Sequence, residues 1–120
     1  MDWLARMMQL PKDFLSEGKG GGVIQGTASE SVLVSIVAAR HRAITRLNMQ
    51  DDVNANGKFV VYCSTQTHSS VKKACMIAGI HLDHLRTLDV DPETLALQPE
   101  VFLSAVEVRH VLCYKMFACV

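Results

Sequence analysis

The sequence predicts an α/β fold with a mostly parallel sheet and flanking helices. Short apolar runs at 23–25, 59–63 and 80–88 are typical of strands. Longer segments in which apolar residues recur at helical spacing separate these runs. Strands that alternate with helices imply right-handed crossovers, and right-handed crossovers place the strands in a parallel sheet.

Length, composition and charge restrict the class of protein. The chain has 120 residues, of which 49% are hydrophobic and 20% charged, enough for one domain with a buried core. Twelve basic and twelve acidic residues give no net charge, so the electrostatic signature of a nucleic-acid-binding protein is missing. The longest apolar run, 32–39, is far shorter than the roughly 20 residues that span a bilayer. We therefore expect neither nucleic-acid nor membrane partners.

The cysteines and histidines do not form a metal-binding pattern. The chain contains four cysteines, which are Cys63, Cys75, Cys113 and Cys119. Their spacings match no zinc site, and Cys63 and Cys75 fall in apolar segments typical of small core residues. His81 and His84 would point to opposite faces of the predicted strand 80–88. We predict no metal site, and the free thiols suit a reducing compartment, which favours a cytoplasmic location.

The first predicted element is a helix over 2–10, in which Trp3, Leu4 and Met7 recur at helical spacing. Pro11 ends this helix because it has no backbone N–H and clashes with the preceding turn. A flexible loop follows over 16–22, which contains four glycines. The run 23–25 then predicts a short strand.

The next predicted helix begins at Thr27. Thr27 and Glu30 have the spacing of a capping box, in which the side chain of each accepts a hydrogen bond from the backbone amide of the other. The stretch 32–39 is apolar nearly all round, which predicts burial against more than one neighbour. Arg46 suits the negative carboxyl end of this helix.

The second half of the chain repeats the alternation. A polar loop over 50–57 precedes the buried strand 59–63. The helix that follows carries its apolar side chains between 71 and 78, and Gly79 closes it. The run 80–88 predicts a third strand, and a turn at 91–93 precedes a last helix.

The strand, turn and helix start between 20 and 30 form the first candidate site. Free backbone amides and the positive end of a helix dipole converge there, and Ser29 adds a hydroxyl donor, so the segment can bind an anion. An ordinary strand-to-helix turn with a capping box has the same pattern, and this alternative stays open. The segment is neither a Walker loop nor a dinucleotide fingerprint, because its glycine spacing is wrong and no Gly-Lys-Ser/Thr follows.

His68 is the second candidate. Ligands of open parallel sheets collect at the carboxyl ends of the strands, where the segments 26–29 and 64–68 both fall. An imidazole beside an anion site can stack on a planar ligand or hydrogen-bond to it. The alternative is a histidine that caps its own helix.

Three separated motifs resemble the group II pyridoxal-phosphate-dependent amino-acid decarboxylases. They are Met1-Asp2-Trp3-Leu4, the stretch Gly20 to Glu30, and His68-Ser69-Ser70-Val71. Within this family the sequence is most similar to the aromatic-L-amino-acid decarboxylases, with the histidine and tyrosine decarboxylases close behind. The resemblance implies part of the large domain of a fold type I enzyme, with pyridoxal 5′-phosphate as cofactor, an aromatic L-amino acid as substrate, and a homodimer.

The resemblance also assigns roles to individual residues. Ala28 and Ser29 match the positions that hold the cofactor phosphate. His68 matches the histidine that stacks on the pyridine ring and helps to place the substrate. We therefore expect Ala28, Ser29 and His68 to bind the cofactor, and His68 to be catalytic.

The sequence departs from the family in its last part. We expect residues 1–109 to be a fragment of the large domain and 110–120 to be a tail outside the family, in which Lys115 has no matching context. The Asn-Pro-His-Lys segment of the Schiff-base lysine and the His-Val-Asp-Ala-Ala segment of the aspartate that pairs with the ring nitrogen do not occur. We therefore expect a truncated decarboxylase that is inactive alone. Two alternatives stay open: a non-catalytic isoform that binds a full-length subunit, and a small phosphate-binding domain unrelated to decarboxylation.

Overall fold

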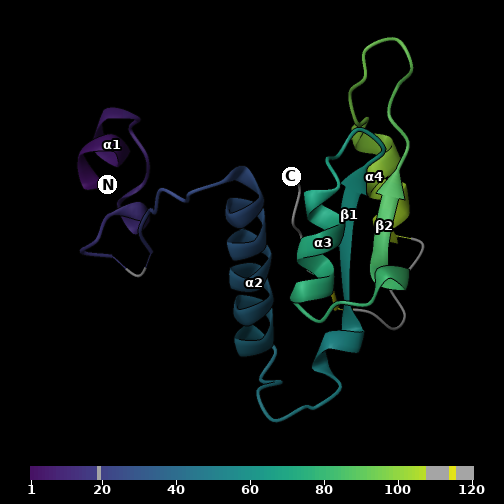
Figure 1. The fold of residues 1–120 in the computed structure, drawn as a ribbon, viewed down its shortest axis with the longest axis horizontal. Helices are drawn as coiled ribbons and strands as arrows, with labels where there is room; N and C mark the ends of the chain where they lie inside the picture. Colours follow the sequence, from purple (N-terminus) through teal and green to yellow (C-terminus); the bar gives the residue numbers. More distant parts are fainter. Residues whose placement is uncertain (19, 108–113, 116–120) are drawn as a thin grey trace.

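The computed structural model describes residues 1–18, 20–107 and 114–115, and its central strand is β1, Phe59–Ser64 (Figure 1). β1 is the middle strand of a three-stranded sheet with the order β2-β1-β3. It pairs in parallel with β2, Leu85–Leu88, and with β3, Tyr114–Lys115. The predicted α/β class with a parallel sheet is therefore confirmed. The predicted tail 110–120 lies outside the described residues except for β3.

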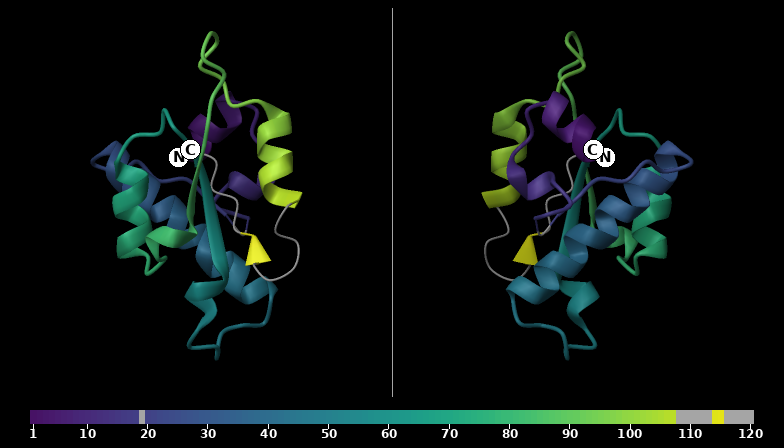
Figure 2. Two further views of the ribbon diagram at one scale, coloured as in Figure 1. Left: turned by 90° about the vertical axis from the view of Figure 1, so that its right-hand side faces the viewer. Right: turned by 90° about the vertical axis from the view of Figure 1, so that its left-hand side faces the viewer.

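The helices cover both faces of the sheet, as Figure 2 shows, with α2 and α3 on one side of the strands and α4 on the other. Their bounds, with those of the short 3-10 turns, are α1 Asp2–Met7, η1 Lys12–Phe14, α2 Ala28–Arg46, η2 Ala55–Lys58, α3 Ser70–Ile77, η3 Leu82–His84 and α4 Pro99–Glu107. Among the described residues, no helix is both long enough and apolar enough to cross a membrane.

Alternate residues of β1 enter two different layers of packing. Phe59 and Val61 belong to the core cluster that β1 forms with α2 and α3. Tyr62 faces the other way, where its ring meets that of Phe102 edge to face with 5.7 Å between ring centres. Because both faces are covered, the strand needs a continuous apolar run, which is the pattern that predicted it.

The two cysteines of the predicted core are confirmed as buried free thiols. Cys63 on β1 is 7% exposed and Cys75 on α3 is fully buried. Burial raises the pKa of the Cys75 thiol, with a smaller contribution from Cys63. Cys75 therefore stays protonated and unreactive at neutral pH.

α2 holds the end of α3. The guanidinium of Arg40 donates a hydrogen bond to the carbonyl oxygen of Ala78, and Ile36 is fully buried in the core. Directly after Ala78 the chain reverses at Gly79, whose φ of 74° lies in the left-handed region. A glycine adopts that conformation without the strain a Cβ would bring, so the predicted closure of this helix by Gly79 is confirmed.

The first 26 residues form an arm that folds partly on itself (Figure 1). The carboxylate of Asp2 accepts hydrogen bonds from the amide of Ser16 at 3.0 Å and from its hydroxyl at 2.5 Å. These bonds lower the pKa of Asp2, so their stabilising effect is present above the ordinary carboxyl pKa and is lost at more acidic pH. The helix ends at Met7 rather than at residue 10, because Gln9 takes a positive φ of 55°.

The predicted strand 23–25 is absent from the described structure. Val23 and Ile24 are 64% and 78% exposed, and no described strand pairs with them. A β-branched run needs a neighbouring strand to form a ladder, and none of the described segments supplies one.

The predicted strand 80–88 begins only at Leu85, because the turn η3 takes its first part. The Nδ1 atom of His81 accepts a hydrogen bond from the amide of Asp83 at 3.3 Å, which favours a turn over an extended chain. The prediction that His81 and His84 lie on opposite faces of a strand is therefore wrong.

The expectation that α2 is buried all round is also wrong for the described chain. Ile36 is its one buried residue, whereas Val34 and Val37 are 44% and 38% exposed. α3 covers one face of α2, and the apolar side chains on the other face remain in contact with solvent.

The contributions of a buried and an exposed isoleucine near the end of α3 to the free energy of unfolding can be compared. Ile80 is 1% exposed and Ile77 is 69% exposed. We expect Ile80→Val to lower the free energy of unfolding by about 1 kcal/mol, because it removes a buried methylene and leaves a small cavity. Ile77→Val makes the same chemical change at the surface and should change the free energy by a few tenths of a kcal/mol at most. Urea unfolding followed by circular dichroism measures both, and equal effects would contradict the packing described.

Candidate functional site

A cavity of about 480 Å³ lies at the carboxyl end of β1, between the first turns of α2 and α3. Ala28 and Ser29 line it from α2, and His68 lines it from the loop before α3. The three predicted site residues therefore share one cavity. Its wall also includes Ser64 and Ser70, which the sequence did not single out as site residues.

The capping box at the start of α2 is formed as predicted. The hydroxyl of Thr27 accepts from the amide of Glu30 at 3.1 Å, and the carboxylate of Glu30 accepts from the amide of Thr27 at 3.0 Å. Gly26 leaves room for that carboxylate, since a Cβ at this position would lie 3.0 Å from its oxygen. The capping box therefore bonds the amides of Thr27 and Glu30 and leaves the two amides between them without a partner in the box.

Those remaining amides belong to Ala28 and Ser29. Neither amide, nor the hydroxyl of Ser29, has a hydrogen-bond partner within the part of the chain that the structure describes. All three donors lie at the positive end of the dipole of a 19-residue helix. The capping box and an anion site are therefore compatible, because each uses different donors.

The loop after β1 is held by short-range hydrogen bonds. The amide of Ser64 donates to the hydroxyl of Thr67 at 3.0 Å, and the amide of Thr67 donates to the carbonyl of Ser64 at 3.0 Å. The amide of Thr65 donates to the carbonyl of Leu88 at 2.9 Å, which ties the loop to β2. These bonds hold the backbone that leads to His68 at the carboxyl end of the sheet.

His68 both caps α3 and keeps a donor free. Its Nδ1 accepts a hydrogen bond from the amide of Ser70 at 3.2 Å, and its carbonyl accepts one from the amide of Val71 at 3.2 Å. An accepting Nδ1 carries no proton, so the proton of the neutral ring is on Nε2. The residue is exposed and lines the cavity, and its Nε2–H has no hydrogen-bond partner among the described residues. The two interpretations of His68 in the sequence are thus compatible.

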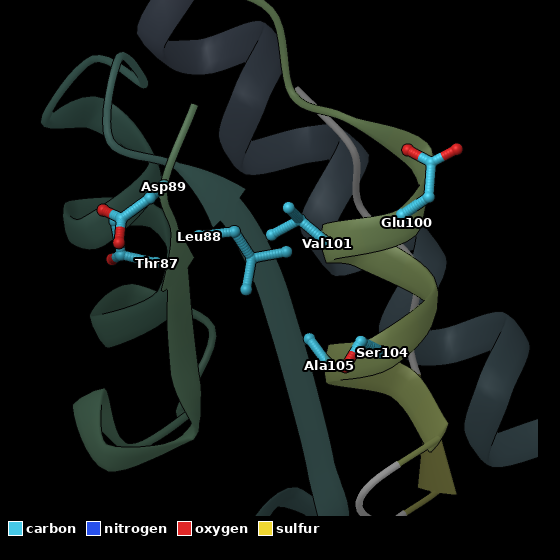
Figure 3. Close-up of a pocket in the computed structure, with 7 residues that line it drawn as sticks. All are labelled: Thr87, Leu88, Asp89, Glu100, Val101, Ser104 and Ala105. Atoms are coloured by element: carbon cyan, nitrogen blue, oxygen red, sulfur yellow. The ribbon is translucent and has the colours of Figure 1, made fainter. Parts of the chain in front are cut away.

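A second hollow, of about 610 Å³, lies between β2 and α4 (Figure 3). Leu88 and Val101 point toward one another across it, whereas Asp89 and Glu100 point away from each other at its edges. Carboxylates that do not converge cannot hold a cation together. Among the described residues, no group of three or more histidine, cysteine or acidic side chains is placed to bind a metal ion.

Comparison with known sequences identifies close relatives. The pyridoxal-dependent decarboxylase conserved domain matches residues 1–111. Phenylacetaldehyde synthase of Arabidopsis thaliana is 50% identical over 107 residues, which cover 88% of this chain and 21% of that protein. Tyrosine decarboxylase 2 of Narcissus pseudonarcissus is 49% identical over 107 residues, with coverage of 88% and 21%. The chain spans about a fifth of the length of these relatives.

Solved structures show the same similarity. The crystal structure of Catharanthus roseus tryptophan decarboxylase in complex with L-tryptophan matches with a TM-score of 0.74 and 44% identity, over 89% of this chain and 22% of that chain. Oryza sativa TDC with PLP and tryptamine matches with a TM-score of 0.73 and 40% identity, over the same shares of the two chains.

The contribution of the capping box can be tested at Thr27. We expect Thr27→Ala to lower the free energy of unfolding by about 1 kcal/mol, because the amide of Glu30 loses its acceptor. Thr27→Ser keeps the oxygen and should leave most of the stability intact. Urea unfolding of both variants provides the measurement, and indistinguishable midpoints would show that the box does not stabilise α2.

Proposed function

The chain belongs to the pyridoxal-dependent decarboxylase family, and we propose that its cavity is part of a cradle for pyridoxal 5′-phosphate. The amides of Ala28 and Ser29, with the Ser29 hydroxyl, bind the phosphate. His68 lies against the pyridine ring. One observation carries this proposal: donors of α2 that the capping box does not use line the same cavity as His68.

The described residues fit two chemical parts of this cofactor. A phosphate needs several converging N–H and O–H donors, and the first turn of α2 supplies them near a positive helix end. A planar ring needs a flat neighbour, and the exposed imidazole of His68 is one. When bound, the cofactor supplies an electron-withdrawing ring that stabilises the negative charge left by departing carbon dioxide.

His68 has a second role in the proposal, which is to hold one proton in a fixed direction. Because the amide of Ser70 bonds to Nδ1, the Nε2–H is available to the cavity. That N–H can donate to the carboxylate of an amino acid placed over the ring, which would orient the substrate. The role needs no proton transfer by His68, only a donor at Nε2.

We propose decarboxylation of an aromatic L-amino acid as the activity of the full-length protein. Its relatives are named for tyrosine, tryptophan and phenylacetaldehyde, which share an aromatic ring, and one solved relative binds L-tryptophan. The proposal includes a cytoplasmic homodimer, with residues 1–109 as part of the large domain and 110–120 outside it. The 120 residues contain no Asn-Pro-His-Lys segment, so we propose that they are inactive alone.

A second candidate function is docking on a full-length subunit without catalysis. Exposed apolar side chains favour it, among them Trp3 at 87% and Ile24 at 78% exposure. Co-purification of the chain with a tagged full-length relative would support it, and separate elution of the two would contradict it. Family membership excludes the third alternative, a phosphate-binding domain unrelated to these enzymes.

Phosphate binding by the amide of Ala28 can be tested with proline. Ala28→Pro removes this N–H, at the first helical position, where proline is accommodated. Thr27 already has the extended conformation that a following proline requires, with φ −140° and ψ 156°. We expect at least a tenfold weaker affinity for pyridoxine 5′-phosphate, because a hydrogen bond to a charged group contributes about 1.5–3 kcal/mol.

Isothermal titration calorimetry gives the affinity, and the probe has no aldehyde that could react with surface lysines. Ala28→Ser keeps the amide and serves as the matched control, with unchanged affinity expected. Equal affinities of the proline and serine variants would contradict the proposed role of the Ala28 amide. A wild-type chain that does not prefer pyridoxine 5′-phosphate over pyridoxine would overturn the phosphate site as a whole.

Catalysis by the 120-residue chain is predicted to be absent. We expect carbon dioxide release from L-tyrosine or L-tryptophan, in the presence of pyridoxal 5′-phosphate, to be no faster than with the cofactor alone. The physical reason is that no family lysine is present to anchor and activate the cofactor. Release above the rate of the free cofactor, measured with carboxyl-labelled substrate, would refute this.

A further inference from the structure

Ser70, the first residue of α3, is a buried residue whose hydroxyl the proposed site has not yet used. Ser70 is 8% exposed, and among the described residues it is the one polar residue that is buried. Its amide donates to His68, but its hydroxyl has no hydrogen-bond partner among the described residues. Ser70 lines the cavity, and its hydroxyl is not one of the fully enclosed unpaired polar atoms of the described residues, so the hydroxyl is accessible to a ligand in the cavity.

The position of Ser70 shows which part of a ligand it would meet. A smaller hollow of about 210 Å³ continues from the main cavity along the seam between α2 and α3, where Lys73 and Ile77 line it. Ser29 and Ser70 are the two residues that line both hollows. The two serines therefore lie together at the junction, one from the first turn of each helix.

We propose that the Ser70 hydroxyl donates a hydrogen bond to the phosphate bound by Ala28 and Ser29. This inference rests on the proposed function and adds a donor from α3 to the donors of α2. An anionic oxygen satisfies the unpaired hydroxyl, and the positive end of α3 favours an anion at this place. The phosphate would then join the two helices directly, in addition to their side-chain packing.

A purely structural role for Ser70 makes a different prediction. If the position only requires a small side chain where α2 approaches α3, alanine serves equally well. Alanine keeps the small volume and the amide that bonds to His68, and removes the hydroxyl alone. Ser70→Ala therefore separates a hydrogen-bond donor from a packing residue.

The experiment compares two ligands that differ only in the phosphate. We expect Ser70→Ala to weaken the binding of pyridoxine 5′-phosphate about tenfold and to leave the binding of pyridoxine unchanged. Ser69→Ala is the matched control, because Ser69 is exposed and its side chain makes no capping bond. Both affinities of this control should equal those of the wild-type chain. Isothermal titration calorimetry provides the six dissociation constants, two each for the wild-type chain and the two variants.

The outcomes separate the two proposals. Unchanged affinity of Ser70→Ala for pyridoxine 5′-phosphate overturns the role of Ser70, while a loss in Ala28→Pro still supports the phosphate site. Equal losses for both ligands in Ser70→Ala also overturn it, because the contact would then be to the ring. A wild-type chain without preference for the phosphorylated ligand overturns both proposals. If circular dichroism shows that Ser70→Ala does not fold, Ser70→Cys replaces it, because cysteine keeps the shape of serine but is a weak donor. The ratio of its affinities for pyridoxine 5′-phosphate and pyridoxine then decides the question.

Discussion

Burial of β1 on both faces is the constraint on which the rest of the structure depends. Residues 59–63 are at most 7% exposed, with strands on both sides and helices above and below. Parallel strands cannot be joined by a tight turn, so the chain must cross over the sheet to reach β2. α3 makes this crossover, and its first turn must therefore lie at the carboxyl end of β1. The site forms there because the topology leaves α3 no other place to begin.

Much of this arrangement is predictable from the sequence, for local reasons. The continuous apolar run of β1 specifies a strand covered on both faces, and the capping box of α2 is made by residues within one turn of each other. The run 23–25 shows where such reasoning ends, because a strand depends on a neighbour that local sequence does not specify. The turn η3 shows a second limit, since a side-chain hydrogen bond of His81 favours a turn where the apolar run 80–88 predicted a strand.

The candidate site was predicted to a similar extent. The rule that ligands collect at the carboxyl ends of parallel strands holds for His68, which follows β1. The strand 23–25, on which the same rule relied for Ala28 and Ser29, is absent from the described structure, yet all three residues line one cavity because α2 begins there. The predicted capping box already implied that the amides between Thr27 and Glu30 stay free, but only the structure shows that Ala28 and Ser29 line the same cavity as His68. The sequence could not single out Ser70, since its serine neighbours look the same until burial distinguishes them. Polar residues in the first turn of a helix after a buried strand are the signal to examine.

The end of the arm, which leads into α2, has a consequence for the integrity of the chain. Its backbone makes no ladder, Val23 and Ile24 are exposed, and the core cluster contains no residue before Val32. Such a stretch is where an endoprotease can seat an extended substrate. Limited digestion would divide the chain at this tether into a short arm and a resistant body. The cut would fall only a few residues before the free amides of α2, so the body would keep its anion-binding helix start but lose the connection that leads into it.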